Sequence, residues 1–323
     1  MRIARALFAI WLFGLSLSVA RARAQEIKVT LLGTGTPIPT AERFGPSTLI
    51  EAGGQILLID CGRGVPIRLW QLGIPLSAVT TVFLTHLHSD HTVGIPDLWL
   101  TGWLPPPFGR RSSPFHIIGP SGTKDLMAGL ERAFAWDIRT RIPDENLSPQ
   151  GIAVVADEIR EGLVYNKGGV KVTAFDVDHG PLIHPALGYR IDYGVHSVVI
   201  SGDTRPSENL MKVSQGADVL IHEVALAPPG QTVRSDAARR IIGHHTTPEE
   251  VGRIFSRLKP KLAVYSHIVL LTTESNVAAP TIDDIVQATR RSYNGPLQVG
   301  EDLMTITIAQ TVSVRRFTAP NSK

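Results

Sequence analysis

The sequence contains a single cysteine, Cys61, among its 323 residues. One thiol cannot form an internal disulfide, so the fold is stabilised without one even in an oxidising compartment. Cys61 follows an apolar run over residues 56–59, and we interpret it as a small buried residue rather than a reactive thiol. The sequence also lacks an internal repeat, a low-complexity tract and a clear linker. These absences favour one domain, for which the length is sufficient.

Beyond the first 24 residues the sequence lacks any continuous apolar run of about 18 residues, the minimum for a membrane-spanning helix. The start is different, because Arg2 and Arg5 precede an apolar run over residues 6–20, and Ala22-Arg23-Ala24 precedes Gln25. This order is typical of a secretory signal peptide, which predicts a signal over 1–24 and a mature domain over 25–323. An uncleaved anchor is the alternative, but the run is short for a span. We therefore expect a periplasmic or secreted protein with no stable membrane span after cleavage.

The mature chain also lacks a charge excess. The predicted signal holds four of the 32 basic residues and no acidic ones, which leaves 28 basic residues against 29 acidic, a formal charge of −1. The high isoelectric point of about 9.1 therefore belongs largely to the predicted signal. A protein of this charge shows no global signature of nucleic-acid binding, although a local basic patch stays possible.

What the sequence does contain is the run His86-Leu87-His88-Ser89-Asp90-His91. Imidazole and carboxylate groups are the ligands that suit zinc and similar first-row metals. The run follows an apolar segment that reads as a buried strand, and two side chains two residues apart on extended backbone point the same way. The pattern predicts a loop that serves two neighbouring metals, with His86 and His88 on one and Asp90 and His91 on the other. The alternative is a polar loop whose histidines have only structural partners.

Candidate ligands recur where predicted strands end, at Asp60, His86, His179, Asp203 and His267. Strand ends that gather at one edge of a sheet build a rigid site, and Asp60 is a good partner for a ligand histidine. The expected architecture is one domain of two facing sheets with helices outside. Predicted strands cover 27–32, 48–51, 55–60, 80–84, 115–118, 170–177, 187–191, 197–200, 219–221, 262–265 and 304–317. Predicted helices cover 64–72, 123–134, 206–214, 248–258 and 281–292, and residues 139–168 are expected to form loops and short strands.

Residues 97–114 contain Trp99, Trp103, three consecutive prolines and Arg110-Arg111. Prolines favour extended backbone, so we expect no regular element beyond a first helical turn or two. Two tryptophans near a metal loop suggest a substrate wall. A loop that merely covers the core is the alternative.

Taken together, His86-x-His88-x-Asp90-His91 followed by His179, Asp203 and His267 resembles the metallo-β-lactamase superfamily. Three more segments resemble its ribonuclease Z and arylsulfatase-like branch, namely LLGTGTP at 31–37, SGDT at 201–204 and GHHTT at 243–247. The resemblance covers nearly the whole mature chain. It implies an α/β (α+β) fold, specifically a four-layer αββα sandwich, and a site for two Zn²⁺, with manganese or iron as possible substitutes.

The resemblance also implies roles for individual residues. His86, His88 and His179 would hold one zinc, Asp90, His91 and His267 the second, and Asp203 would bridge both. Asp90 and Asp203 would share in catalysis with His245, which we interpret as a general acid; an ordinary surface histidine is the alternative. His222 and Glu223 would support the ligands or serve the fold alone.

These observations lead to an exported dinuclear zinc hydrolase that cleaves a sulfate or phosphate ester by a metal-bridging hydroxide, as arylsulfatase-like enzymes do. The alternatives are a ribonuclease Z-like phosphodiesterase or endoribonuclease and a β-lactam or lactone hydrolase; a non-catalytic binding protein is disfavoured because all seven ligands are present. Only 24 positions separate His179 from Asp203, too few for the long arm with which ribonuclease Z enzymes grip tRNA. We therefore expect a small-molecule ester substrate and no nucleic-acid partner, and by analogy a homodimer.

Overall fold

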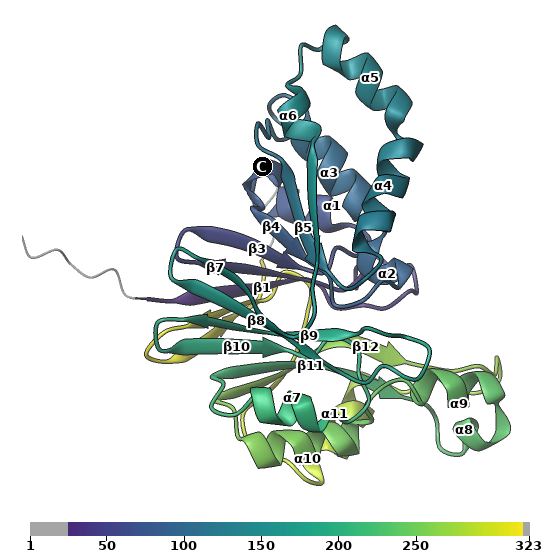
Figure 1. The fold of residues 1–323 in the computed structure, drawn as a ribbon. Coiled ribbons are helices and arrows are strands. Elements are labelled where there is room, and N and C mark those ends of the chain that lie inside the picture. Colours follow the sequence, from purple (N-terminus) through teal and green to yellow (C-terminus); the bar gives the residue numbers. More distant parts are fainter. Residues whose placement is uncertain (1–24, 319–323) are drawn as a thin grey trace, which may run out of the picture.

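Two β-sheets lie face to face in the computed structural model, which describes residues 25–318, and helices cover both outer faces (Figure 1). The αββα sandwich expected from the sequence is thereby confirmed. The predicted signal peptide, residues 1–24, lies outside the described residues. Within the described part of the chain, no helix has the length and apolar character needed to cross a bilayer.

The first sheet has eight strands in the order β15-β14-β1-β2-β3-β4-β5-β6. Its strands are β1 (Ile27–Gly33), β2 (Ser47–Ala52), β3 (Gln55–Ile59), β4 (Thr81–Phe83), β5 (Phe115–Gly119), β6 (Val154–Glu158), β14 (Thr305–Ile308) and β15 (Val312–Arg315). Strands β3, β4, β5 and β6 run parallel to one another. Their carboxyl ends therefore lie at one edge.

The second sheet has seven strands in the order β13-β12-β11-β10-β9-β8-β7. Its strands are β7 (Gly162–Lys167), β8 (Val170–Asp176), β9 (Leu187–Tyr193), β10 (His196–Ile200), β11 (Val219–Leu226), β12 (Leu262–Leu270) and β13 (Leu297–Val299). Strands β10 to β13 are parallel, and β9 is antiparallel to both β8 and β10. Strand β8 thus points the same way as β10, β11 and β12.

The helices lie between the strands along the chain. They are α1 (Val65–Gln71), the 3-10 turn η1 (Leu76–Ala78), α2 (Ser89–Thr92), α3 (Ile95–Trp103), α4 (Thr123–Ala133), α5 (Ala135–Asp144), α6 (Pro149–Ile152), α7 (Glu208–Val213), α8 (Gln231–Arg234), α9 (Asp236–Ile242), α10 (Pro248–Leu258) and α11 (Ile282–Arg290). Helix α10 begins with a capping box in which Thr247 and Glu250 bond reciprocally, and Pro248 occupies its first turn. Its limits match the predicted 248–258.

Three apolar layers hold the sandwich together. The central layer lies between the sheets and is built from residues such as Val29, Tyr189 and Val264. A second layer joins the first sheet to α1, α3, α4 and α6, and a third joins the second sheet to α7, α10 and α11. Cys61 is buried in the second layer, and burial raises the pKa of its thiol, which agrees with its interpretation as a small core residue.

The structure corrects two of the predicted segments. Residues 139–168 are not only loops and short strands, because α5 and α6 lie in this region beside β6 and β7. In the segment 97–114 the expected helical turn or two is the end of α3, but this helix brings Trp99 and Trp103 onto one buried face. Their indole N–H groups donate to the Ile152 and Ser148 carbonyls, so the tryptophans cover the core and form no substrate wall.

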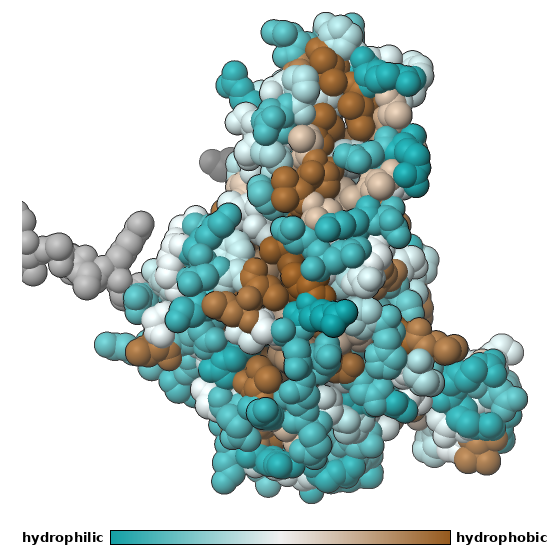
Figure 2. Space-filling model, in the orientation of Figure 1, coloured by the Kyte–Doolittle hydropathy of each residue, from teal (hydrophilic) through white to brown (hydrophobic). Residues whose placement is uncertain are grey.

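Helices α4 and α5 project beyond the sheets (Figure 1). Figure 2 shows a band of apolar residues along this projection on an otherwise largely hydrophilic face. The apolar side chains of the projection pack only partly against the core, as with Leu130, Phe134 and Ile138. Helix α4 begins beside the loop of the predicted ligands, where Gly122 lies next to Leu87.

Candidate metal centre

All seven predicted ligands meet at the edge where the parallel strands of both sheets end. Strand β4 leads to His86 and His88, β8 to His179, and β10 to Asp203, while His267 lies on β12. Their nitrogen and oxygen atoms form overlapping groups of three, in each of which all atoms lie within 4.8 Å of one another. Segments separated by up to 181 positions, from His86 to His267, thus build one cluster.

The first group consists of His86, His88 and His179. His86 Nε2 lies 2.9 Å from His88 Nδ1, and His179 Nε2 lies 3.4 Å from the same nitrogen. His86 and His179 are buried, whereas His88 is exposed at the residue that precedes α2. Three imidazole nitrogens therefore face one point, as the sequence predicted for the first metal.

The second group consists of Asp90, His91 and His267. The short helix α2 presents both Asp90 and His91, and Asp90 Oδ2 lies 3.6 Å from His91 Nε2 and 3.3 Å from His267 Nε2. All three side chains are buried. This is the set that the sequence predicted for the second metal.

Asp203 lies between the two groups. Its Oδ2 is 3.4 Å from His91 Nε2, 3.3 Å from His267 Nε2 and 3.8 Å from His179 Nε2. The preceding Gly202 has φ = 60°, and a Cβ atom there would lie 2.5 Å from the Leu187 carbonyl oxygen. Only glycine fits this turn without strain, and the turn is what aims Asp203 at both groups.

A β-bulge positions His267, which the sequence analysis expected after a strand and not within one. His222 of β11 pairs with Tyr265 of β12, but Val224 pairs with Ile268, so Ser266 and His267 together oppose Glu223. Bulges of this kind redirect side chains and are common beside active sites. His267 itself adopts φ = 45°, a left-handed conformation that is rare for residues other than glycine.

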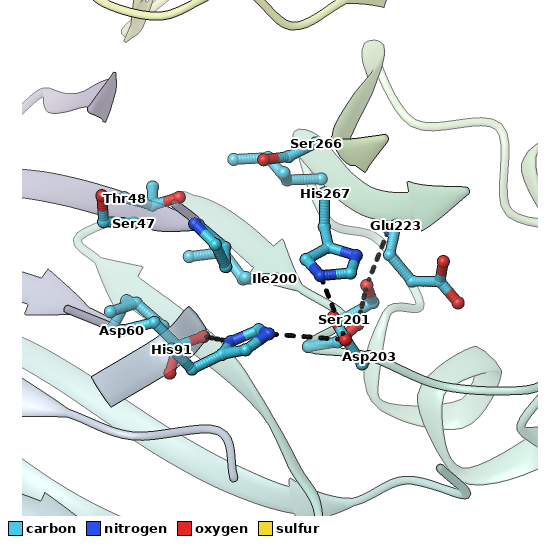
Figure 3. A pocket seen from close by; sticks show the side chains of 14 residues that line it. Ser47, Thr48, Asp60, His91, Ile200, Ser201, Asp203, Glu223, Ser266 and His267 are labelled. Carbon is cyan, nitrogen blue, oxygen red and sulfur yellow. Dashed lines mark hydrogen bonds and ion pairs between the residues drawn. The ribbon is translucent and has the colours of Figure 1, made fainter. Parts of the chain in front are cut away.

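Asp60 supports the second group from behind, as predicted for this strand end. Its Oδ2 lies 2.8 Å from His91 Nδ1 and accepts a hydrogen bond of 2.8 Å from the Thr85 hydroxyl, while its Oδ1 accepts from the Thr85 N–H. Figure 3 shows His91 between Asp60 on one side and Asp203 on the other. The carboxylate therefore orients the ring so that Nε2 faces the cluster.

The charges at the cluster favour neutral imidazole in the first group. Burial lowers the pKa of His86 well below its ordinary value and that of His179 to about 4, and partial desolvation of the ring lowers the pKa of the more exposed His88. A neutral imidazole has the free lone pair that metal binding requires. Although burial opposes ionisation of Asp203, the neighbouring His267 and His91 hold its pKa well below the usual range.

The donor set of the cluster fits two divalent cations. His91 Nε2 and Asp203 Oδ1 are buried but have no hydrogen-bond partner among the described residues. Buried polar atoms without a partner are costly unless a ligand satisfies them. Imidazole nitrogens with a few carboxylates are a typical zinc donor set, and manganese or iron accepts the same atoms.

Glu223 and His245 form a further pair beside the cluster. Glu223 Oε2 lies 3.3 Å from His245 Nδ1, and its Oε1 accepts from the Thr246 N–H at 2.8 Å. Burial disfavours the charged imidazole, but the Glu223 carboxylate outweighs it and raises the pKa of His245 to about 9. His245 thus lies at the site, where the sequence placed its candidate acid.

His222 points away from the site, whereas its neighbour Glu223 points toward it. Its Nδ1 bonds the Glu223 carbonyl oxygen at 2.7 Å, and its ring packs edge-on against Phe255 of α10. His222 is therefore a core residue, and of the two it is Glu223 that reaches the site. Alternation along β11 could have separated them, since neighbouring side chains on a strand point to opposite faces.

A cavity of about 320 Å³ opens onto the cluster, and its walls were not foreseen from the sequence. His88, Asp90, His179, Asp203 and His267 line one part of it. The remaining wall comes from residues 36–38, from Ile241, His244 and His245 around the end of α9, and from Val269 and Leu271. The predicted wall over 97–114 contributes nothing to this cavity, and Arg111 is itself buried against Gly151.

Comparisons with known proteins place this geometry in a family. Residues 56–268 match the family described as the beta-lactamase superfamily domain. The protein named ribonuclease Z from Mycolicibacterium gilvum is 34% identical over 284 residues, which cover 86% of this chain and 94% of the relative. The ribonuclease Z from Mycobacterium avium is 36% identical over 280 residues, covering 86% and 96%.

Solved structures agree in fold. The metallo-β-lactamase-fold protein YhfI from Bacillus subtilis superimposes with a TM-score of 0.66 at 20% identity, over 88% of this chain and 99% of that one. The short form of human tRNase Z gives a TM-score of 0.64 at 23% identity, over 86% and 98%. At these identities the likeness concerns the fold alone.

Proposed function

This chain belongs to the metallo-β-lactamase superfamily, in the branch that contains the ribonuclease Z proteins, and from this membership we propose that it hydrolyses phosphodiester bonds. The observation that carries the proposal is the convergence of two three-residue ligand groups on Asp203. The relatives named ribonuclease Z favour this phosphodiesterase alternative over the sulfate ester that stood first in the sequence analysis.

The cofactor that we propose is a pair of Zn²⁺ ions, with manganese or iron as substitutes. His86, His88 and His179 would hold one ion, Asp90, His91 and His267 the other, and Asp203 would lie between them. When bound, such a pair supplies Lewis acidity and a nucleophile at neutral pH.

The chain's own residues have distinct tasks in this proposal. Asp60 holds a proton on His91 Nδ1 and so leaves Nε2 free to act as a ligand. Glu223 Oε2 lies 3.3 Å from His245 Nδ1, and its negative charge favours a proton on the ring. With Nδ1 beside Glu223, Nε2 is the nitrogen left for the cluster. From there His245 can donate a proton to the departing alcohol oxygen, the step that most needs an acid in ester cleavage.

The comparisons bear on one earlier expectation and leave another untested. Relatives named ribonuclease Z reduce the weight of the expectation that nucleic acid is no substrate, although β9 and β10 fill the interval between His179 and Asp203 and leave no long arm there. Export to the periplasm or beyond remains part of the proposal and rests on the sequence pattern of residues 1–24 alone.

One comparison of substrates tests the proposed activity. Zinc-loaded mature protein is assayed with bis-p-nitrophenyl phosphate, p-nitrophenyl sulfate and a tRNA precursor, with Asp203→Ala as the blank. We expect hydrolysis of the diester well above the blank. We also expect kcat/KM for the diester to exceed kcat/KM for the sulfate. A preference for the sulfate would return the enzyme to the arylsulfatase reading, and activity on neither ester would direct attention to lactams and lactones.

A further inference from the structure

The cavity at the metal centre has two chemically different sides. One side carries the predicted ligands, and the other carries the aliphatic side chains of Pro37, Ile38, Ile241, Val269 and Leu271. Three separate segments supply these residues: the loop after β1, the end of α9 and the end of β12. In Figure 1, α9 lies beyond the sheet edge at which β12 ends.

The exposure of these residues indicates a ligand surface rather than a core. Ile38 is 58% exposed and Ile241 is 37% exposed, although both line the cavity. Val269 is buried and Leu271 is half-buried, so the aliphatic surface continues inward from the mouth. A concave apolar surface beside a few convergent polar groups is the usual form of a small-molecule site.

The lining offers little to a polar or polyanionic substrate. None of the described residues that line the cavity is lysine or arginine. Apart from the metal-centre residues and His245, its polar side chains are those of Thr36 and His244. Nucleic-acid backbones are bound chiefly through lysine and arginine contacts to phosphates, and sugars need hydrogen-bond partners.

We propose that this cavity holds an apolar alcohol group, alkyl or aryl, of a small phosphate ester whose anionic phosphate lies at the metal centre. The inference rests on the proposed function, because it assigns the alcohol group of the proposed phosphate ester to the aliphatic residues of the cavity. A volume of about 320 Å³ is at the small end of the range for small-molecule pockets. One short alkyl or aryl group fits such a space, and a folded polynucleotide does not.

Binding of simple phosphate monoesters tests the proposal without requiring turnover. Calorimetry on the zinc-loaded protein gives Kd for methyl, butyl and phenyl phosphate and for thymidine 5′-monophosphate. Each buried methylene contributes about a threefold to fourfold gain in affinity, so butyl phosphate should bind at least about tenfold more tightly than methyl phosphate. The thymidine nucleotide should bind more weakly than the butyl ester.

Two variants and a matched control locate the preference. Ile38→Asn and Ile241→Asn should each lower the butyl-to-methyl affinity ratio by about threefold or more. Ile67→Asn changes an isoleucine of similar exposure, 53%, on α1 and outside the cavity, so the ratio should stay as in the wild type.

The outcomes separate this inference from the proposed function. Three results overturn the inference about the apolar alcohol group, even if bis-p-nitrophenyl phosphate is hydrolysed. They are a butyl-to-methyl affinity ratio near one, tighter binding of the nucleotide than of butyl phosphate, and no binding of any monoester. A clear butyl preference in a protein that hydrolyses no diester overturns the proposed activity and leaves the inference standing. If Ile67→Asn lowered the butyl-to-methyl affinity ratio as much as Ile38→Asn does, the cavity would not be the cause of the butyl preference.

Discussion

Replacement of Asp60 by asparagine isolates the contribution of the carboxylate behind His91. The side chains have the same shape, and asparagine tolerates the left-handed conformation that Asp60 adopts at φ = 59°. The carboxylate offers acceptors to the Thr85 N–H on one oxygen and to the Thr85 hydroxyl and His91 Nδ1 on the other. The asparagine amide has one acceptor oxygen in place of two. Its N–H₂ group therefore faces donors that the second carboxylate oxygen accepted from.

We expect the loss of the Asp60 carboxylate in Asp60→Asn to appear mainly as weaker metal binding. Removing a carboxylate that orients a ligand histidine typically lowers metal affinity by about 10- to 100-fold, which corresponds to about 1.4–2.7 kcal/mol. A buried donor left without an acceptor costs the metal-free protein about 1–3 kcal/mol of unfolding free energy. Competition with a chelator measures the first quantity, and denaturant unfolding of the metal-free protein measures the second.

Asp218→Asn is the matched control for this experiment. Asp218 is 6% exposed against 5% for Asp60, and it accepts from the Ser197 N–H, pairs with Lys261, and lies 3.5 Å from His196 Nδ1. Its replacement should lower stability but leave zinc affinity within about twofold of the wild type, because it contacts no predicted ligand. If both variants bind zinc as the wild type does, or lose affinity equally, the role assigned to Asp60 is wrong.

Four further predictions follow from the same geometry. Alanine in place of His88 or Asp203 should abolish turnover and reduce bound metal; full activity or full metal content in either variant contradicts the ligand assignment. Chelation of the metal should lower Tm, since a ligand at 100 times its Kd stabilises by about 2.7 kcal/mol, and an unchanged Tm would count against a resident ion. Glu223→Gln, which keeps an oxygen for the Thr246 N–H, should lower kcat by roughly 100-fold with little effect on metal content; unaltered kcat would show that His245 needs no carboxylate. Trp99→Phe should cost about 1–3 kcal/mol of stability through the lost bond to Ile152 but leave the substrate profile unchanged, and a shifted profile would restore the tryptophan wall.

The convergence of the candidate ligands could be predicted because they follow a pattern that recurs at strand ends. His86 and His88 lie two residues apart on extended backbone, so their nitrogens meet wherever the loop goes. Strands β8 and β10 point the same way in one sheet, and therefore His179 and Asp203 reach the same edge once the strand direction is known. Asp60 follows β3 of the other sheet and joins them only because the two sheets pack face to face.

The position of His267 depended on information that one strand does not contain. Strand β12 is buried continuously up to Val269, and only the pairing with β11 reveals that two of its residues oppose Glu223. A bulge is a property of two strands. Alternation along β11 separates His222 from Glu223, but which of the two faces the core becomes known only from the packing of His222 against Phe255.

The error over 97–114 and the missed cavity wall have a common cause. Trp99 and Trp103 were interpreted as a substrate wall because they lie near the metal loop in sequence, yet they are four residues apart and so share one face of α3. That spacing is itself a signature of a core-facing helix. The wall that does face the metal centre contains no aromatic residue; it joins Ile38, Ile241 and Leu271 from three distant segments. Each of these is unremarkable in its own stretch of sequence, and only their meeting beside the ligands gives them a chemical meaning. In our proposal the substrate preference of the site is set by these wall positions, which lie outside the candidate ligand set.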